Sequence, residues 1–150
     1  ILPSFPQLKL YPEAANASLS DDPETLPRLI PGYEKRARRI TEAFATDAVP
    51  LKAIYLLEND DNLSITLMRP QDALVHLITH SYAARIFKKS LTGSRAGTHL
   101  QQCVEIVRRI PVFNLKRPHR LDRLDELSNL VEVESRKLIS RSRETQQQTA

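Results

Sequence analysis

The stretch Val49–Arg69, VPLKAIYLLENDDNLSITLMR, carries the clearest fold signal in the chain. Residues 49–58 form a mostly apolar run, and residues 63–69 alternate apolar with polar side chains at the two-residue period of a strand. The linking residues 59–62, Asn-Asp-Asp-Asn, tolerate turn geometry and bond their own backbone. We therefore expect a central β-hairpin, with its first strand buried on both faces and its second strand exposing one face to water.

The composition is that of one domain-sized chain with mixed charge. At 150 residues the chain can bury about two thirds of the surface that its unfolded form exposes. No run approaches the roughly 20 apolar residues of a membrane helix, so we expect a cytoplasmic protein with no membrane partner. The single cysteine, Cys103, suits a reducing compartment. The net charge is only +4, and the basic residues are scattered among acidic ones. Both features argue against nucleic acid as a partner.

Prolines shape the first fifty residues. Prolines 3, 6 and 12 surround residues 7–11, which predicts an edge strand or an extended arm, and one helical turn is expected at 16–19. Residues 20–24, Ser-Asp-Asp-Pro-Glu, combine a capping oxygen, an early proline and acidic side chains, as at the start of a short helix. An apolar spacing of four, three and four residues then predicts a helix over Tyr33–Phe44; its members are Tyr33, Ala37, Ile40 and Phe44.

Three more helices and one strand are expected in the rest of the chain. A helix beginning at Pro70 runs to about Lys89, and its inner side holds Leu74, Leu77, Ile78, Ser81 and Tyr82. A second helix spans about 95–109, with an apolar side formed by Leu100, Cys103, Val104, Val107 and Ile110. Residues 111–115 predict a short strand, and the last helix begins near Arg120. We expect residues 140–150 to form a flexible polar tail. The fold class is thus α/β or α+β, a mixed sheet with three to four flanking helices.

Several residues are of types that occur in metal-binding or catalytic sites, but the complete motif of such a site is absent from the sequence. His76 and His80 are four apart, which lets two imidazoles bind one metal ion, but no third ligand accompanies them. We therefore expect packing or surface histidines and no metal site. The pairs Asp21-Asp22 and Asp60-Asp61 occupy cap and turn positions that favour aspartate. Cys103 lies on an inner helix face, which predicts an inert core thiol and not a nucleophile.

Four cations fall at the start of the predicted helix over Tyr33–Phe44, the pairs Lys35-Arg36 and Arg38-Arg39. Cations at a helix N-terminus oppose the helix dipole. A phosphate bound there would gain from both the dipole and the positive charges. The alternative is a solvated basic face.

Four segments occur in an order found in a known family. They are Pro6–Ala15 (PQLKLYPEAA), Glu34–Arg36 (EKR), Pro50–Leu57 (PLKAIYLL) and Arg109–Pro118 (RIPVFNLKRP). Together they resemble the C-terminal half of HPr-kinase-like proteins, relatives of HPr serine kinase/phosphorylase and of ATP-dependent phosphoenolpyruvate carboxykinase. The similarity spans about residues 1–133.

The resemblance implies part of a P-loop-kinase-like fold. Complete proteins of this kind bind ATP and magnesium and transfer the γ-phosphoryl group to a hydroxyl of a protein or a small molecule. Such proteins use a glycine-rich phosphate loop followed by an aspartate pair. Gly32, Gly93 and Gly97 cannot form that loop, and Asp21-Asp22 are not that pair because they lie after the Pro6–Ala15 segment. We expect both on a missing N-terminal half, so that residues 1–139 are the C-terminal portion of the domain, inactive and without ATP or magnesium when alone. The resemblance assigns Lys35 and Arg36 to phosphate contacts and allows a homo-oligomer.

A second hypothesis is a non-enzymatic module that binds a protein or a nucleic acid. It would use the basic faces of the predicted helices at Tyr33–Phe44 and Tyr82–Lys89. Binding of nucleic acid through these faces would weaken steeply with salt, because displaced counterions drive it.

Overall fold

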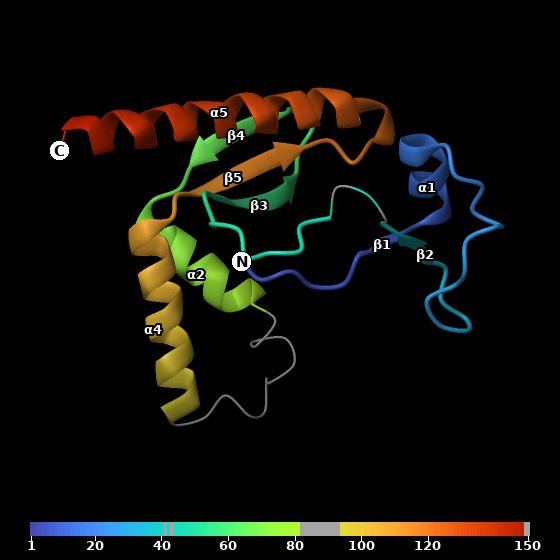
Figure 1. Cartoon of the computed structure of the whole chain (residues 1–150), viewed down its shortest axis with the longest axis horizontal. Coiled ribbons are helices and arrows are strands. Elements are labelled where there is room, and N and C mark those ends of the chain that lie inside the picture. Colours follow the sequence, from blue (N-terminus) through green and yellow to red (C-terminus); the bar gives the residue numbers. More distant parts are fainter. Residues whose placement is uncertain (41, 43, 82–93, 149–150) are drawn as a thin grey trace. The chain divides into compact units, whose positions relative to one another are not determined.

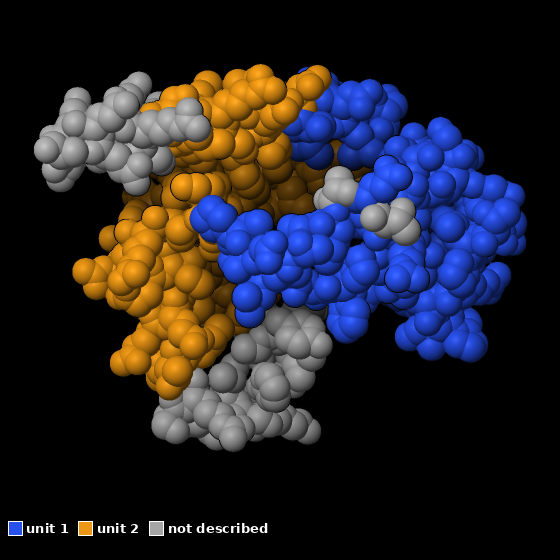
Figure 2. Space-filling view, in the orientation of Figure 1, with its two compact units in different colours: residues 1–50, 120–128 blue, residues 51–119, 129–150 orange. Residues whose placement is uncertain are grey.

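The computed structural model describes residues 1–40, 42, 44–81 and 94–148, with side chains omitted at 94–95 and 141–148. Contacts divide the chain into two compact units (Figure 2). Unit 1 comprises residues 1–50 and 120–128, and unit 2 comprises residues 51–119 and 129–150.

The predicted mixture of helices and strands is confirmed (Figure 1). The elements are β1 (Gln7–Leu10), α1 (Pro12–Leu19), β2 (Arg36–Arg39), β3 (Ile54–Asn59), β4 (Ser64–Leu67), α2 (Pro70–His80), α4 (Ser94–Arg109), β5 (Val112–Arg117), the 3₁₀ turn η1 (Leu121–Arg123) and α5 (Leu124–Gln148). In the described part of the chain, no helix combines the length and apolar character needed to cross a bilayer.

Unit 1 is built on a short antiparallel ribbon of β1 and β2, in register from Gln7 opposite Arg39 to Leu10 opposite Arg36. The expected strand at residues 7–11 is thereby confirmed. Helix α1 follows at once, because Pro12 occupies its first turn, where a missing N–H costs nothing. The helix ends at Leu19, and Ser20 after it adopts a left-handed conformation with φ 54°. The helical turn predicted at 16–19 is therefore the second half of a longer helix.

The helix predicted over Tyr33–Phe44 is wrong, because Arg36–Arg39 form strand β2. Its backbone is paired on both edges: β1 lies along one, and Ala37 N donates to Pro27 O at 2.8 Å on the other. Gly32, with φ 79°, provides the turn that brings the chain back. Pairing with distant segments thus outweighs a four-residue apolar spacing.

The short helix predicted to start at residues 20–24 is also absent. The Asp22 carboxylate accepts a hydrogen bond from the Glu24 backbone N at 3.0 Å, and Thr25 Oγ1 donates to Asp22 O at 2.7 Å. These bonds close a turn of the type that aspartate favours. The same side chain that can cap a helix therefore closes a loop here.

Unit 2 contains a three-stranded sheet with the order β3-β5-β4. Both strands of the predicted hairpin exist, but the hairpin is wrong because β5 lies between them, parallel to β3 and antiparallel to β4. The central strand is the most buried of the three, since Val112, Phe113 and Leu115 are 3–5% exposed. Strand β3 is an edge strand, with Leu57 63% exposed, so its predicted burial on both faces is also wrong.

Helices α2 and α4 pack against each other in unit 2, where Ala73 and Cys103 are buried. Helix α2 ends at His80, and the continuation predicted to Lys89 lies outside the described residues. Leu100, predicted to face inward, is 45% exposed on α4. Helix α5 lies along the sheet (Figure 1), with Tyr55 Oη 3.4 Å from Ser135 Oγ, and it continues past residue 140, where we expected a flexible tail.

Candidate functional site

Arg36, one of the two predicted phosphate contacts, is a buried cation at the start of β2. Its side chain is 6% exposed. Nε donates to Pro23 O at 2.8 Å, and Nη2 donates to Glu24 Oε1 at 3.0 Å. Nη1 is buried and has no hydrogen-bond partner within the described chain. A buried charged donor without an acceptor is costly, so Nη1 is an unfavourable feature of this part of unit 1.

A cavity of about 170 Å³ adjoins this arginine in unit 1, lined by Pro12, Glu13, Arg28, Glu34 and Arg36. Arg28 and Arg36 are brought together by a bridge between their backbones. Two guanidinium groups can contact one phosphoryl group, but Glu13 and Glu34 add two negative charges to the same space. The formal charges of the two arginines and the two glutamates therefore cancel.

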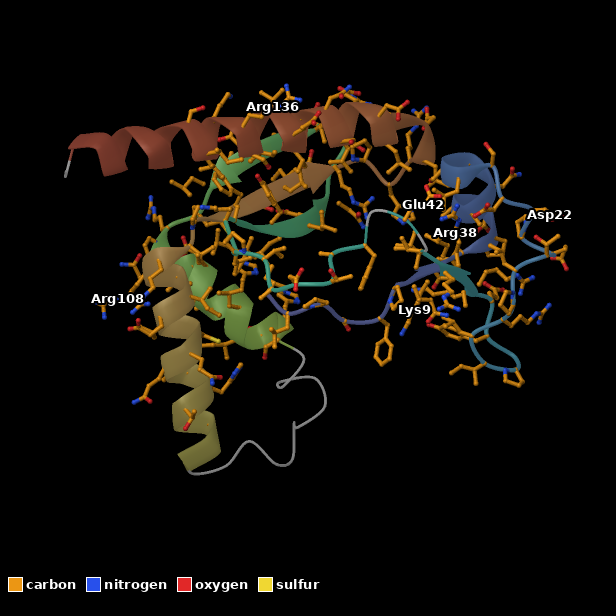
Figure 3. All side chains as sticks on the ribbon, viewed as in Figure 1. Lys9, Asp22, Arg38, Glu42, Arg108 and Arg136 are labelled. Atoms are coloured by element: carbon orange, nitrogen blue, oxygen red, sulfur yellow. The ribbon has the colours of Figure 1, made fainter. Side chains whose placement is uncertain are left out.

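The predicted pair Lys35 and Arg36 does not point to one place. Lys35 Nζ lies over the Tyr11 ring, 4.7 Å from its centroid, in a cation–π contact. Lys35 is not among the residues that line the cavity. Arg38, on the same strand (Figure 3), forms an ion pair with Asp21. Of the four predicted cations, Arg36 alone is both buried and next to a cavity.

A larger cavity, of about 470 Å³, lies in unit 2; it is lined by Tyr55, Leu56, Leu57, Glu58, Met68, His76, His80 and Asn114. Its polar residues come from three elements. Asn114 Nδ2 on β5 donates to Glu58 Oε2 on β3 at 2.6 Å. The rings of His76 and His80 on α2 are stacked, with centroids 5.8 Å apart and planes at 9°. The volume is that of a small-molecule site.

The histidine pair does not form a metal centre with its neighbours. Across the described ranges, no three His, Cys, Asp or Glu side chains are placed to hold a metal ion. Sequence reasoning had noticed the two histidines but not Glu58 or Asn114, which lie 56 residues apart. Only the pairing of β3 with β5 brings them together.

Cys103 is buried in α4, where burial raises the pKa of its thiol. Its Sγ lies 3.8 Å from Nε2 of His99, a residue that the sequence analysis missed although it stands four positions earlier on the same helix. Nε2 is also 3.0 Å from Ser81 Oγ. The predicted core position of Cys103 is confirmed by its burial, and burial of this kind disfavours the thiolate form that acts as a nucleophile.

Comparisons with known proteins give no match for this chain. No protein-family model matches it, and neither a curated protein nor a solved structure is significantly similar to it. Its function is therefore argued from its own residues.

Proposed function

We propose that this chain is the C-terminal part of an HPr-kinase-like phosphotransferase, an enzyme of the cytoplasm that transfers the γ-phosphoryl group of ATP to a hydroxyl. The observation that carries the proposal is the position of the four similar segments. In chain order they contain β1 with the start of α1, the entry to β2, most of β3, and β5. Segments that form the strands are those that a shared fold constrains most.

The sheet of unit 2 supports the same assignment. A parallel pair such as β3 and β5 requires a long crossover connection, and here that connection includes α2 and α4. Along their outer edges, β3 and β4 pair with no other strand of the described chain. Such edges can accept further strands. A sheet of this type is compatible with addition of the strand that would carry a phosphate loop.

Other polypeptide of the complete enzyme must supply that loop in this proposal, because the sequence holds only three separate glycines. The contribution of this chain to chemistry is Arg36. Its guanidinium group, beside the 170 Å³ cavity, would stabilise the negative charge that develops on the transferred group. Lys35, the residue before Arg36, is held over Tyr11 and does not line that cavity.

The alternative function is binding of a protein or nucleic acid through basic helix faces. The first of these faces, predicted at Tyr33–Phe44, does not exist as a helix. Residues 36–39 form a strand, Arg36 is buried, and Arg38 is ion-paired with Asp21. The second surface, Tyr82–Lys89, lies outside the described residues.

The decisive experiment measures phosphoryl transfer by the complete protein from radiolabelled ATP. We expect its coding sequence to include a Gly-x-x-Gly-x-Gly-Lys-Ser/Thr-like loop, and we expect Arg36→Gln to lower kcat by about 10- to 1000-fold with a smaller change in KM for ATP. Arg136→Gln, at an arginine 73% exposed on α5, is the matched control and should leave kcat unchanged. Circular dichroism of both variants checks that they fold.

Three results would count against separate parts of the proposal. A complete protein without such a loop would overturn the kinase assignment. Tight magnesium-ATP binding by the 150-residue chain alone would show that the nucleotide site is misplaced. Full activity of a folded Arg36→Gln variant would remove only the role given to Arg36.

A further inference from the structure

We propose that the 470 Å³ cavity of unit 2 binds an alkylguanidinium group, independently of the function proposed above. The cavity, the paired Glu58 and Asn114, and the stacked histidines carry this inference. None of these residues belongs to the four cations of unit 1.

The charge of the cavity selects a cation. Its lining holds one carboxylate, Glu58, and no lysine or arginine from the described residues. Lys116 is close enough for its charge to interact with Glu58, but its Nζ donates a hydrogen bond to Asp60 at 2.8 Å. The negative charge of Asp60 compensates the positive charge of Lys116. The carboxylate is therefore the dominant charge that a ligand in this cavity would meet.

The hydrogen-bonding groups select a ligand rich in donors. Asn114 Nδ2 is used in the bond to Glu58 Oε2, and that bond orients both side chains. It leaves Glu58 Oε1 and Asn114 Oδ1 as acceptors from neighbouring strands. A guanidinium group presents several N–H donors in one plane and matches adjacent oxygen acceptors better than a single ammonium does.

The remaining walls fit the rest of such a ligand. Leu56, Leu57 and Met68 offer apolar surface for an aliphatic chain. The parallel rings of His76 and His80 offer flat faces on which a planar guanidinium can stack. Polar groups that fix orientation beside apolar walls are the usual make-up of a small-molecule site.

The test compares two probes of the same shape, butylguanidinium and the uncharged butylurea, by two-dimensional NMR of the full chain at mildly alkaline pH. We expect butylguanidinium to shift the amide signals of residues 56–58 and the side-chain amide of Asn114. Butylurea should bind at least about 10-fold more weakly, because it lacks the charge-assisted bond to Glu58.

Variants locate the interaction. Glu58→Gln keeps the shape of the side chain and should weaken butylguanidinium binding about 10-fold, whereas Asp125→Asn, at an exposed carboxylate in unit 1, should leave it unchanged. Equal binding of the two probes, shifts confined to other residues, or normal binding by folded Glu58→Gln would overturn the inference.

A final titration identifies the source of the guanidinium. Tighter binding of a blocked Gly-Arg-Gly peptide than of butylguanidinium would assign the cavity to an arginine side chain of a peptide. Equal or weaker binding of the peptide would assign it to a free small molecule.

Discussion

Asp60 shows how one side chain serves both a turn and an ion pair. Its carboxylate accepts a hydrogen bond from Lys116 Nζ at 2.8 Å and another from the Asn62 backbone N at 3.0 Å. These bonds, the one from Lys116 foremost, lower the pKa of Asp60, and the bond to Asp60 raises the pKa of Lys116. The turn role of Asp60 was predicted from the sequence. Its partner on β5 was not.

The lowered pKa of Asp60 makes stability depend on pH in the acid range. The folded protein holds this carboxylate charged at a lower pH than the unfolded chain does, so the contribution is complete above the unfolded pKa, about 4. It is lost as the pH falls through the folded pKa. We expect Asp60→Asn to flatten the decline of the unfolding free energy below about pH 5.

Urea denaturation across this pH range measures the effect, with the neighbouring Asp61→Asn as control. At the alkaline end the sign reverses, because the raised pKa of Lys116 makes its contribution vanish only as the pH rises through the folded value. An unchanged acid slope in Asp60→Asn would show that the bond to Lys116 does not persist in solution.

Strand β5 organises unit 2. It is the only strand of this sheet that is paired on both edges within the described chain, and its Phe113 ring stacks on Tyr55 of β3 with centroids 5.3 Å apart. Leu115 is 3% exposed, whereas Leu57, opposite it on β3, is 63% exposed. The same residue type therefore has very different surroundings on two paired strands.

Replacing these two leucines should lower the free energy of unfolding by different amounts on the central strand and on the edge strand. Leu115→Ala removes buried methyl groups and leaves a cavity, so we expect a loss of about 2–5 kcal/mol in the free energy of unfolding. Leu57→Ala changes an exposed side chain and should cost within about 0.5 kcal/mol. Urea denaturation of both variants is the measurement. A large loss for Leu57→Ala would mean that another chain covers this edge in solution.

The chain forms two compact units that are not continuous in sequence. Unit 1 takes residues 120–128 from the second half, and the helix α5 begins in unit 1 and continues into unit 2. Unit 1 depends on α1 and the β1-β2 ribbon, while unit 2 depends on the sheet with α2 and α4. Each unit thus has its own set of stabilising contacts.

Because each unit has its own stabilising contacts, we expect the two units to differ in their local unfolding. We expect Leu115→Ala to accelerate amide hydrogen exchange in β3, β4 and β5 and to leave the exchange of β1 and β2 unchanged. Exchange followed by mass spectrometry on peptides from each unit makes the comparison, and Leu57→Ala is the control. Equal acceleration in both units would show that the chain unfolds as one cooperative body.

Local sequence patterns were sufficient to identify β1, β3, β4, β5 and α4 and the start of α2, because alternation and helical spacing act between near neighbours. They were not sufficient for β2. This strand is stabilised by pairing with distant segments, and that pairing outweighs the local helical spacing.

Among the candidate site residues, the sequence marked Arg36 and the histidine pair by residue type and spacing alone. The tertiary structure buried Arg36 beside a cavity, turned Lys35 to Tyr11, placed β5 between the hairpin strands, and joined Glu58 to Asn114. Those outcomes depend on contacts between residues far apart in the chain, and no pattern among near neighbours encodes them.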